Sequence, residues 1–215
     1  MRRLGTVLVL RLVQAFDRLR LTLRAALQPG LEIHPSASSN LACARFRLGP
    51  GARLRIGPRV VTERHAGLHF LLEPGAQVEV GEGTWLRTEI NPVYVVAFAG
   101  ARIEIGPEGL LNGCHLSAKR ELRLGRRVWV GPGTRVFDAD QHERDAERPE
   151  RVAPVEIGDF AWIASDATVL RGVRIGEHSI VGARSLVTRD VPPHTLAFGQ
   201  PAVPRGRVGD RSKAR

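Results

Sequence analysis

The stretch PVEIGDFAWIASDATVLRGVRIGEHSIVGARSLVTRDV, residues 154–191, decides the fold. Aliphatic side chains recur in it at every sixth position, and a glycine often follows them. A half-buried strand repeats every two residues and an amphipathic helix every 3.6, so neither produces this spacing. A period of six is typical of a parallel β-helix, in which each unit forms one short strand and one corner. The repeated residues are Ile157, Ile163, Val169, Ile175, Val181 and Val187.

Three units close one triangular coil, and successive coils stack about 4.8 Å apart. The repeated aliphatic side chains point into the prism and pack on their counterparts in the next coil, while the following glycine lets the chain turn without a Cβ clash. Leu124, Val130 and Val136 extend the period backwards, and the earlier coils are less regular. From Val136 to Ile157 the spacing is 21 residues, three more than a full coil, so a loop leaves the prism there.

Composition agrees with an all-β solenoid. The chain has 215 residues with 23 glycines and 14 prolines, and aromatics make up only 5% of it. This balance favours short strands joined by tight turns over a helical bundle, whose interior needs bulkier side chains. Cys43 and Cys114 form no CxxC pair, which fits a reducing compartment. We found no signal-peptide pattern near the start, so a cytoplasmic protein is expected.

The net charge of +10 comes almost entirely from arginine. A basic balance attracts anions, yet the sequence contains no helix-turn-helix, zinc-finger or aromatic RNA-reading motif. We therefore expect no nucleic-acid partner. A phosphorylated cofactor and an anionic membrane surface remain as candidate partners.

Three regions are predicted: a basic amphipathic helix over 1–28, the β-helix over 29–191 with a loop near 137–154, and a C-terminal cap and tail over 192–215. In the first region apolar residues recur at helical spacing among arginines. Two interpretations stay open. The helix packs on its own protein or a neighbouring subunit, or it rests on anionic lipid as a peripheral contact at the inner face of the membrane.

The loop reads FDADQHERD over residues 137–145, and His142 in it is a candidate general base. A lone surface histidine is weak support, but the surrounding motifs are specific. Asp138-Ala139-Asp140-Gln141-His142 has the form D-x-D-x-H, the regular coils follow, and GQPA at 199–202 stands where G-N-P-A is usual. From about residue 110 to 207 the chain resembles the hexapeptide-repeat acyltransferases, in particular galactoside and maltose O-acetyltransferases and polysaccharide-modifying enzymes.

This resemblance implies left-handed coils and a homotrimer with active sites between neighbouring prisms. It also implies acetyl-CoA as donor and a hydroxyl of a sugar or polysaccharide precursor as acceptor, with His142 as the base for direct attack on the thioester. Asp138 and Asp140 would orient the imidazole or bind sugar hydroxyls. For Asp138, capping a turn is an equally good interpretation.

On the donor side the resemblance implies contacts from coils and from the C-terminal extension. Small residues would let the pantetheine arm lie against the prism, and arginines would meet phosphates. Two departures from the family pattern are Ala164, where glycine is commoner, and Gln200, where asparagine is usual. The implied donor-binding residues are Trp162, Ala164, Ala183, Thr188, Arg189, Pro201, Ala202 and Arg205.

Other functions were weighed against this one. N-acetylation of a nucleotide-linked amino sugar and a non-catalytic β-helical scaffold are the alternatives. A scaffold would need neither the loop histidine nor a preserved donor-side half, so an enzyme is favoured. His65 and His69 have a spacing that could hold a metal on a helix, but they fall in a β-region, and no metal is expected.

Overall fold

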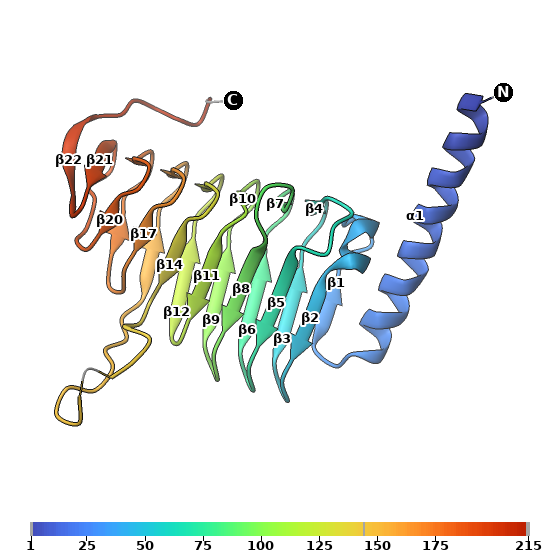
Figure 1. Cartoon of the computed structure of the whole chain (residues 1–215), viewed down its shortest axis with the longest axis horizontal. Coiled ribbons are helices and arrows are strands. Elements are labelled where there is room, and N and C mark those ends of the chain that lie inside the picture. The colour runs from blue at the N-terminus through green and yellow to red at the C-terminus, as the bar shows by residue number, and fades with distance from the viewer. Residues whose placement is uncertain (1, 144, 214–215) are drawn as a thin grey trace.

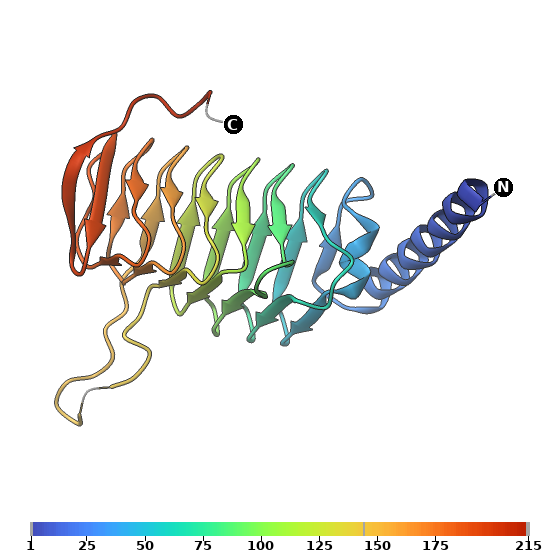
Figure 2. The same cartoon turned by 45° about the horizontal axis from the view of Figure 1, so that its top comes forward.

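A computed structural model describes residues 2–143 and 145–213 of the chain. They form a long three-sided prism with one helix at its N-terminal end and a hairpin at the other (Figures 1 and 2). Helix α1 spans Arg2–Leu27, and a 3-10 helix, η1 (Ser39–Cys43), follows the first strand. This confirms the predicted left-handed parallel β-helix. No helix among the described residues is long and apolar enough to cross a membrane.

Each face of the prism is one sheet, and each coil after the first gives one strand to each face; in the first coil η1 lies between β1 and β2. The first sheet holds β1 (Leu31–Ile33), β3 (Arg53–Ile56), β6 (Gln77–Val80), β9 (Arg102–Ile105), β12 (Glu121–Leu124), β15 (Val155–Ile157) and β18 (Arg174–Ile175). The second holds β2 (Arg45–Leu48), β5 (Leu68–Leu72), β8 (Val93–Ala97), β11 (His115–Ala118), β14 (Arg135–Phe137), β17 (Thr168–Val169) and β20 (Leu186–Val187). The third holds β4 (Val61–Thr62), β7 (Trp85–Arg87), β10 (Leu110–Asn112), β13 (Trp129–Val130), β16 (Trp162–Ile163), β19 (Ile180–Val181), β21 (Thr195–Gly199) and β22 (Ala202–Arg207).

The core is a narrow column of aliphatic side chains inside the prism. All nine residues of the six-residue period are at most 3% exposed, which confirms that they point inward. Strand pairing stacks each on its counterpart, as in Ile163 against Val130 and Val181. The less regular early coils are longer: Arg53 pairs with Gln77 and Gln77 with Arg102. Later coils advance by 18, as Glu156 pairs with Arg174.

The glycines after the aliphatic residues serve close packing between coils. A Cβ at Gly106 would lie 2.4 Å from the carbonyl oxygen of Gly125, and one at Gly176 would lie 2.3 Å from the nitrogen of Pro193. Neither glycine has a positive φ. Glycine is therefore needed at these positions because the next coil lies too close for a Cβ atom. The sequence suggested a different reason, that glycine allows the backbone conformation of the turn.

The three outer faces differ in chemistry. The first sheet presents alternating charges, and Arg55–Glu79 and Arg102–Glu104 pair across or along it. The third sheet presents a nearly unbroken apolar row from one end to the other, with exposed Trp85 and Trp162 in it. Its register aligns Val61, Trp85, Leu110, Trp129, Trp162, Ile180 and Leu196.

The two ends of the prism are closed differently. Helix α1 buries Leu21 and Asp17 against η1 and the first coil. At the other end, β21 extends the third sheet and turns back as antiparallel β22. The tail then runs back along the prism (Figure 2), where the backbone N–H of Val208 donates to the His194 carbonyl at 2.7 Å.

Candidate active site

The loop that carries His142 leaves the prism between β14 and β15, at the corner between the second and first sheets. It projects far from the prism in Figures 1 and 2. Its stem is a short antiparallel pairing of Ala139 with Val152, and a second bridge joins Asp145 and Arg148 near the tip. The loop is thus an arm with an ordered stem, which fixes the direction in which its side chains project.

Asp138 forms the root of this arm and is fully buried. Its carboxylate accepts hydrogen bonds at 2.7 Å from the backbone N–H groups of Lys119, Arg120 and Glu121, in the preceding coil. Burial raises the pKa of Asp138, and the three N–H donors oppose that rise. In this chain the side chain holds a turn, one of the two interpretations drawn from the sequence. Its orienting role toward the imidazole or acceptor stays a prediction.

Asp140 stands two residues farther out and is held by two arginines. Its carboxylate oxygens lie 2.7 Å from Nε of Arg171 and 3.2 Å from Nε of Arg151. Desolvation alone would raise the pKa of Asp140, but the hydrogen bonds from these arginines outweigh it and the pKa lies below its usual value. An ionised Asp140 therefore ties the arm to the coil that carries Arg171.

A lysine not singled out in the sequence clamps the same stem. Nζ of Lys119 lies 2.7 Å from Oε2 of Glu150 and donates to the carbonyl of Gln141 at 3.4 Å. It also stands over the ring of Phe98 at 4.9 Å. Lys119 is one of only two lysines in a chain rich in arginine. That rarity was the one sequence signal that pointed to it.

His142 is the next side chain after this braced stem, and it is exposed. The carboxylates of Asp138 and Asp140 are turned to the stem and bind backbone N–H groups and arginines there, not the imidazole ring. Within one chain the imidazole thus projects outward from a rigid base.

The predicted donor residues fall into two groups on the prism. Ala164 and Ala183 lie on the corner between the third and second sheets, and the turn at Pro201 and Ala202 sits over it. Gln200 Nε2 in that turn donates to the Arg184 carbonyl at 2.7 Å. Thr188 and Arg189 follow β20 and lie at the opposite edge of the second sheet. The structure brings the first group together and separates it from the second by one face.

Trp162, the remaining coil residue of the predicted donor set, lies under the C-terminal tail. The guanidinium of Arg211 is 5.5 Å from the ring centres of both Trp129 and Trp162. Arg211 is fixed by its backbone N–H, which donates to Nδ1 of His178 at 2.9 Å, and by its Nε, which donates to the Phe160 carbonyl. Arg205, on β22, stands 5.7 Å from the Phe198 ring and is exposed.

Histidines on the second sheet form a ring stack that runs toward the arm. The His69 and Tyr94 rings are 4.6 Å apart, His115 is 5.7 Å from Tyr94, and Phe137 is 5.6 Å from His115. Burial lowers the pKa of His115, and the charge of Arg135 adds to this. His115 Nε2 and Asn112 Oδ1 are buried without a hydrogen-bond partner among the described residues.

No group of three or more metal-ligating side chains is clustered within residues 2–143 and 145–213. His69 stacks on Tyr94, and His65 Nδ1 accepts the N–H of Gly67 at 3.2 Å.

Comparison with known proteins agrees with this geometry. Residues 154–189 match the family described as bacterial transferase hexapeptide (six repeats). A provisionally named acetyltransferase of Schizosaccharomyces pombe is 35% identical over 169 residues, which cover 76% of this chain and 77% of that protein. The chain belongs to the hexapeptide-repeat acetyltransferases.

Two further acetyltransferases are similar to this chain, one in sequence and one in fold. Galactoside O-acetyltransferase of Lactococcus lactis is 30% identical over 61% of this chain, and the match spans 64% of that enzyme. The crystal structure of the polysialic-acid-specific acetyltransferase NeuO has a TM-score of 0.61 at 18% identity, covering 87% of this chain and 85% of that one. The latter likeness concerns the fold.

Proposed function

We propose that the protein transfers an acetyl group from acetyl-CoA to a hydroxyl of a sugar or polysaccharide precursor, with His142 as general base. The observation that carries this is the position of His142: exposed, on an arm whose stem is braced by Asp138 and Asp140, directly before the coils that match the family. A mobile surface histidine needs no such bracing. A base that must meet a hydroxyl within hydrogen-bond reach does need it.

The chemistry requires no covalent enzyme intermediate. A neutral His142 nitrogen accepts the proton of the acceptor hydroxyl as its oxygen bonds to the thioester carbonyl carbon. The tetrahedral intermediate then collapses, the C–S bond breaks, and the imidazolium returns the proton to the CoA thiolate. The products are the acetyl ester and free CoA, and the histidine ends neutral.

The donor would lie along the corner of small residues. Ala164 and Ala183 leave room for a pantetheine arm, and the exposed Arg189 and Arg205 fit the phosphates of CoA. In one chain Arg189 stands at the edge of the second sheet opposite Ala164 and Ala183, whereas Arg205 lies on β22 of the third sheet. A single donor molecule would meet both kinds of residue where the edge of one prism faces another.

The outer faces support a homotrimer. An apolar row along the full length of the third sheet is unusual for a face in water, whereas the charged first sheet suits solvent. The second sheet presents Leu71, Val96 and Phe137 in one outward row and Tyr94 in the row beside it. If the second sheet of one chain packs on the third sheet of the next, the contact is heterologous and a closed ring of prisms results. The arm of one chain then lies at its neighbour's surface.

The decisive experiment measures CoA thiol release with a panel of sugar acceptors, including amino sugars, for the wild type, His142→Ala and Glu143→Ala. Glu143 is the exposed neighbour of His142 and serves as the matched control. We expect turnover to fall about 100-fold or more for His142→Ala and to change little for Glu143→Ala. Equal turnover of wild type and His142→Ala would reject the base. Failure to bind acetyl-CoA at about millimolar concentration, the upper range of ordinary KM values, would reject the donor site.

The trimer is tested separately by light scattering. We expect a mass near three times 23.5 kDa for the wild type. Trp85→Arg on the third sheet should dissociate it, and Gln77→Arg, which adds the same charge to the exposed first sheet, should not. A monomeric wild type, or equal behaviour of the two variants, would contradict the arrangement.

A further inference from the structure

Helix α1 carries a stripe of large apolar side chains that faces away from the protein. At 3.6 residues per turn, Leu8, Leu12, Phe16, Leu19 and Leu23 lie on one side of the helix. They are 52–62% exposed, whereas Asp17 and Leu21 on the opposite side are at most 2% exposed. A stripe of this length, uncovered in water, marks a contact surface.

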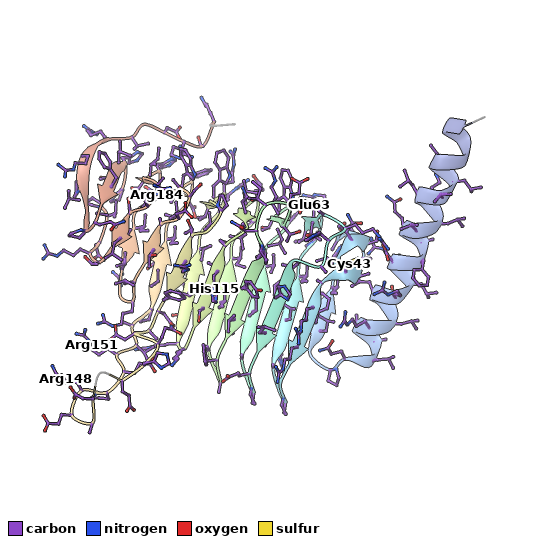
Figure 3. The ribbon with its side chains drawn as sticks, viewed as in Figure 1. Cys43, Glu63, His115, Arg148, Arg151 and Arg184 are labelled. Carbon is purple, nitrogen blue, oxygen red and sulfur yellow. The ribbon has the colours of Figure 1, made fainter. Side chains whose placement is uncertain are left out.

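The helix is attached to the prism by only part of its length. Arg18, Arg20 and Arg24 donate to the carbonyls of Ala37, Ala42 and Ala44, at 2.6, 3.2 and 3.1 Å respectively. All of these contacts, and the Asp17–Arg64 ion pair, belong to the C-terminal half of the helix. The N-terminal half extends beyond the prism (Figures 1 and 2), and Figure 3 shows side chains projecting on both sides of the helix.

Positive charge borders the stripe on both edges. Arg11 and Arg18, seven residues apart, follow one edge, and Arg20 follows the other, where its guanidinium lies 5.7 Å from the Phe16 ring. The helix holds six arginines against one aspartate, and that aspartate is buried. Arg18 and Arg20 use some of their five N–H donors on the prism and keep others for a second acceptor.

We infer that α1 binds the surface of a bilayer containing anionic lipid, with the apolar stripe inserted among the acyl chains and the bordering arginines at the phosphates. The distribution of side chains is that of an interfacial helix: a strongly apolar face and a basic polar flank. Charge complementarity selects anionic lipid as the occupant. Another protein would need an apolar groove edged by carboxylates, and a second copy of this basic helix would oppose arginine to arginine.

The direction of the stripe adds to this inference, and this step rests on the proposed trimer. The helix lies across the end of the prism (Figure 1), with its buried side, Asp17 and Leu21, against η1 and the first coil. The stripe on the opposite side of the helix therefore faces away from the prism. In a ring of parallel prisms the three stripes then face the same way and cannot cover one another. Three coplanar apolar faces match a flat surface, and they multiply the affinity of each.

The test is flotation of the full-length protein with vesicles of phosphatidylcholine alone or with about 30% phosphatidylglycerol. We expect binding to the anionic vesicles at least about tenfold above the neutral ones, weakened when salt rises from about 0.1 M to 0.5 M. The double variant Leu12→Glu with Leu19→Glu should lose about tenfold or more. The control, Gln14→Glu with Gln77→Glu, adds the same charge at exposed positions off the stripe and should bind like wild type.

Acetyl transfer and oligomeric mass are measured on the same variants without vesicles, so that a failure of the proposed reaction is seen separately. Vesicle binding that is equal for the stripe variant and its control would overturn the inference, as would absence of wild-type binding. A wild-type mass of two trimers that the stripe variant reduces to one would also overturn it, because a second assembly would then cover the stripe.

Discussion

Asp140 of the arm and Arg171 of the following coil form an ion pair of 2.7 Å, although 31 positions separate them in sequence. The pair joins the segment that carries His142 to the rigid prism. Arg171 occupies the same corner as Arg189 one coil farther on, and its side chain is mostly buried. We propose it as a positioning residue, because it holds Asp140 in the stem two residues before the proposed base.

Arg171→Met should lower kcat about tenfold while the KM for acetyl-CoA stays within about threefold, because the base loses its geometry and the donor site is left in place. Steady-state kinetics with varied donor would show this split. Arg174→Met is the matched control, since Arg174 only faces Glu156 at 3.8 Å on the exposed first sheet. A rise in KM alone would place Arg171 in donor binding instead.

Asp138→Ala should reduce the free energy of unfolding by about 2–4 kcal/mol, because three backbone N–H groups lose a charged acceptor. Denaturant unfolding at fixed protein concentration would measure it. Asp159→Ala removes a carboxylate that accepts one backbone bond at 2.8 Å on the exposed corner, and should cost about 1 kcal/mol or less. Equal losses for both would mean that Asp138 does not hold the turn.

Cys114 should stay unmodified by an aromatic disulfide reagent at pH 8 in the folded protein. Burial raises the pKa of its thiol to about 12, so about one molecule in ten thousand carries the reactive thiolate, and the side chain is covered. Labelling should accelerate only as the pH approaches 12 or on unfolding. Mass spectrometry of labelled peptides checks this, with the less buried Cys43 as internal reference. Rapid native labelling of Cys114 would contradict its burial.

Asp17→Asn should release helix α1. The carboxylate is 1% exposed and pairs with Arg64 Nε at 2.6 Å, and Arg20 lies 3.7 Å away. Without its charge we expect chymotrypsin to cleave within residues 1–28 about tenfold faster, which corresponds to about 1.4 kcal/mol of local stability. Arg59→Met removes an ion pair with Glu82 on the surface and should leave the cleavage rate unchanged.

The sequence by itself determined the solenoid, because a β-helix is built on a local rule. Ile157, Ile163 and Val169 point inward because each occupies the same position of the six-residue repeat. The register of each coil follows from the one before it. The loop motif with His142 and the resemblance of the later coils to the family could also be recognised in the sequence alone. Part of the apolar outer row of the third sheet could also have been predicted, because Trp129 and Trp162 immediately precede inward residues. Its continuation into the early coils could not, because those coils are longer than 18 residues.

Only the tertiary structure decided what the polar side chains do. Asp138 caps backbone groups one coil away, Asp140 pairs with Arg171, and Arg211 reaches Trp162 from a tail that has no period. These contacts depend on how a corner of the prism, the arm and the tail lie relative to one another. The six-residue repeat does not specify that arrangement. The inward positions obey a spacing that the chain repeats, whereas the polar contacts form between segments that only the folded coil brings together.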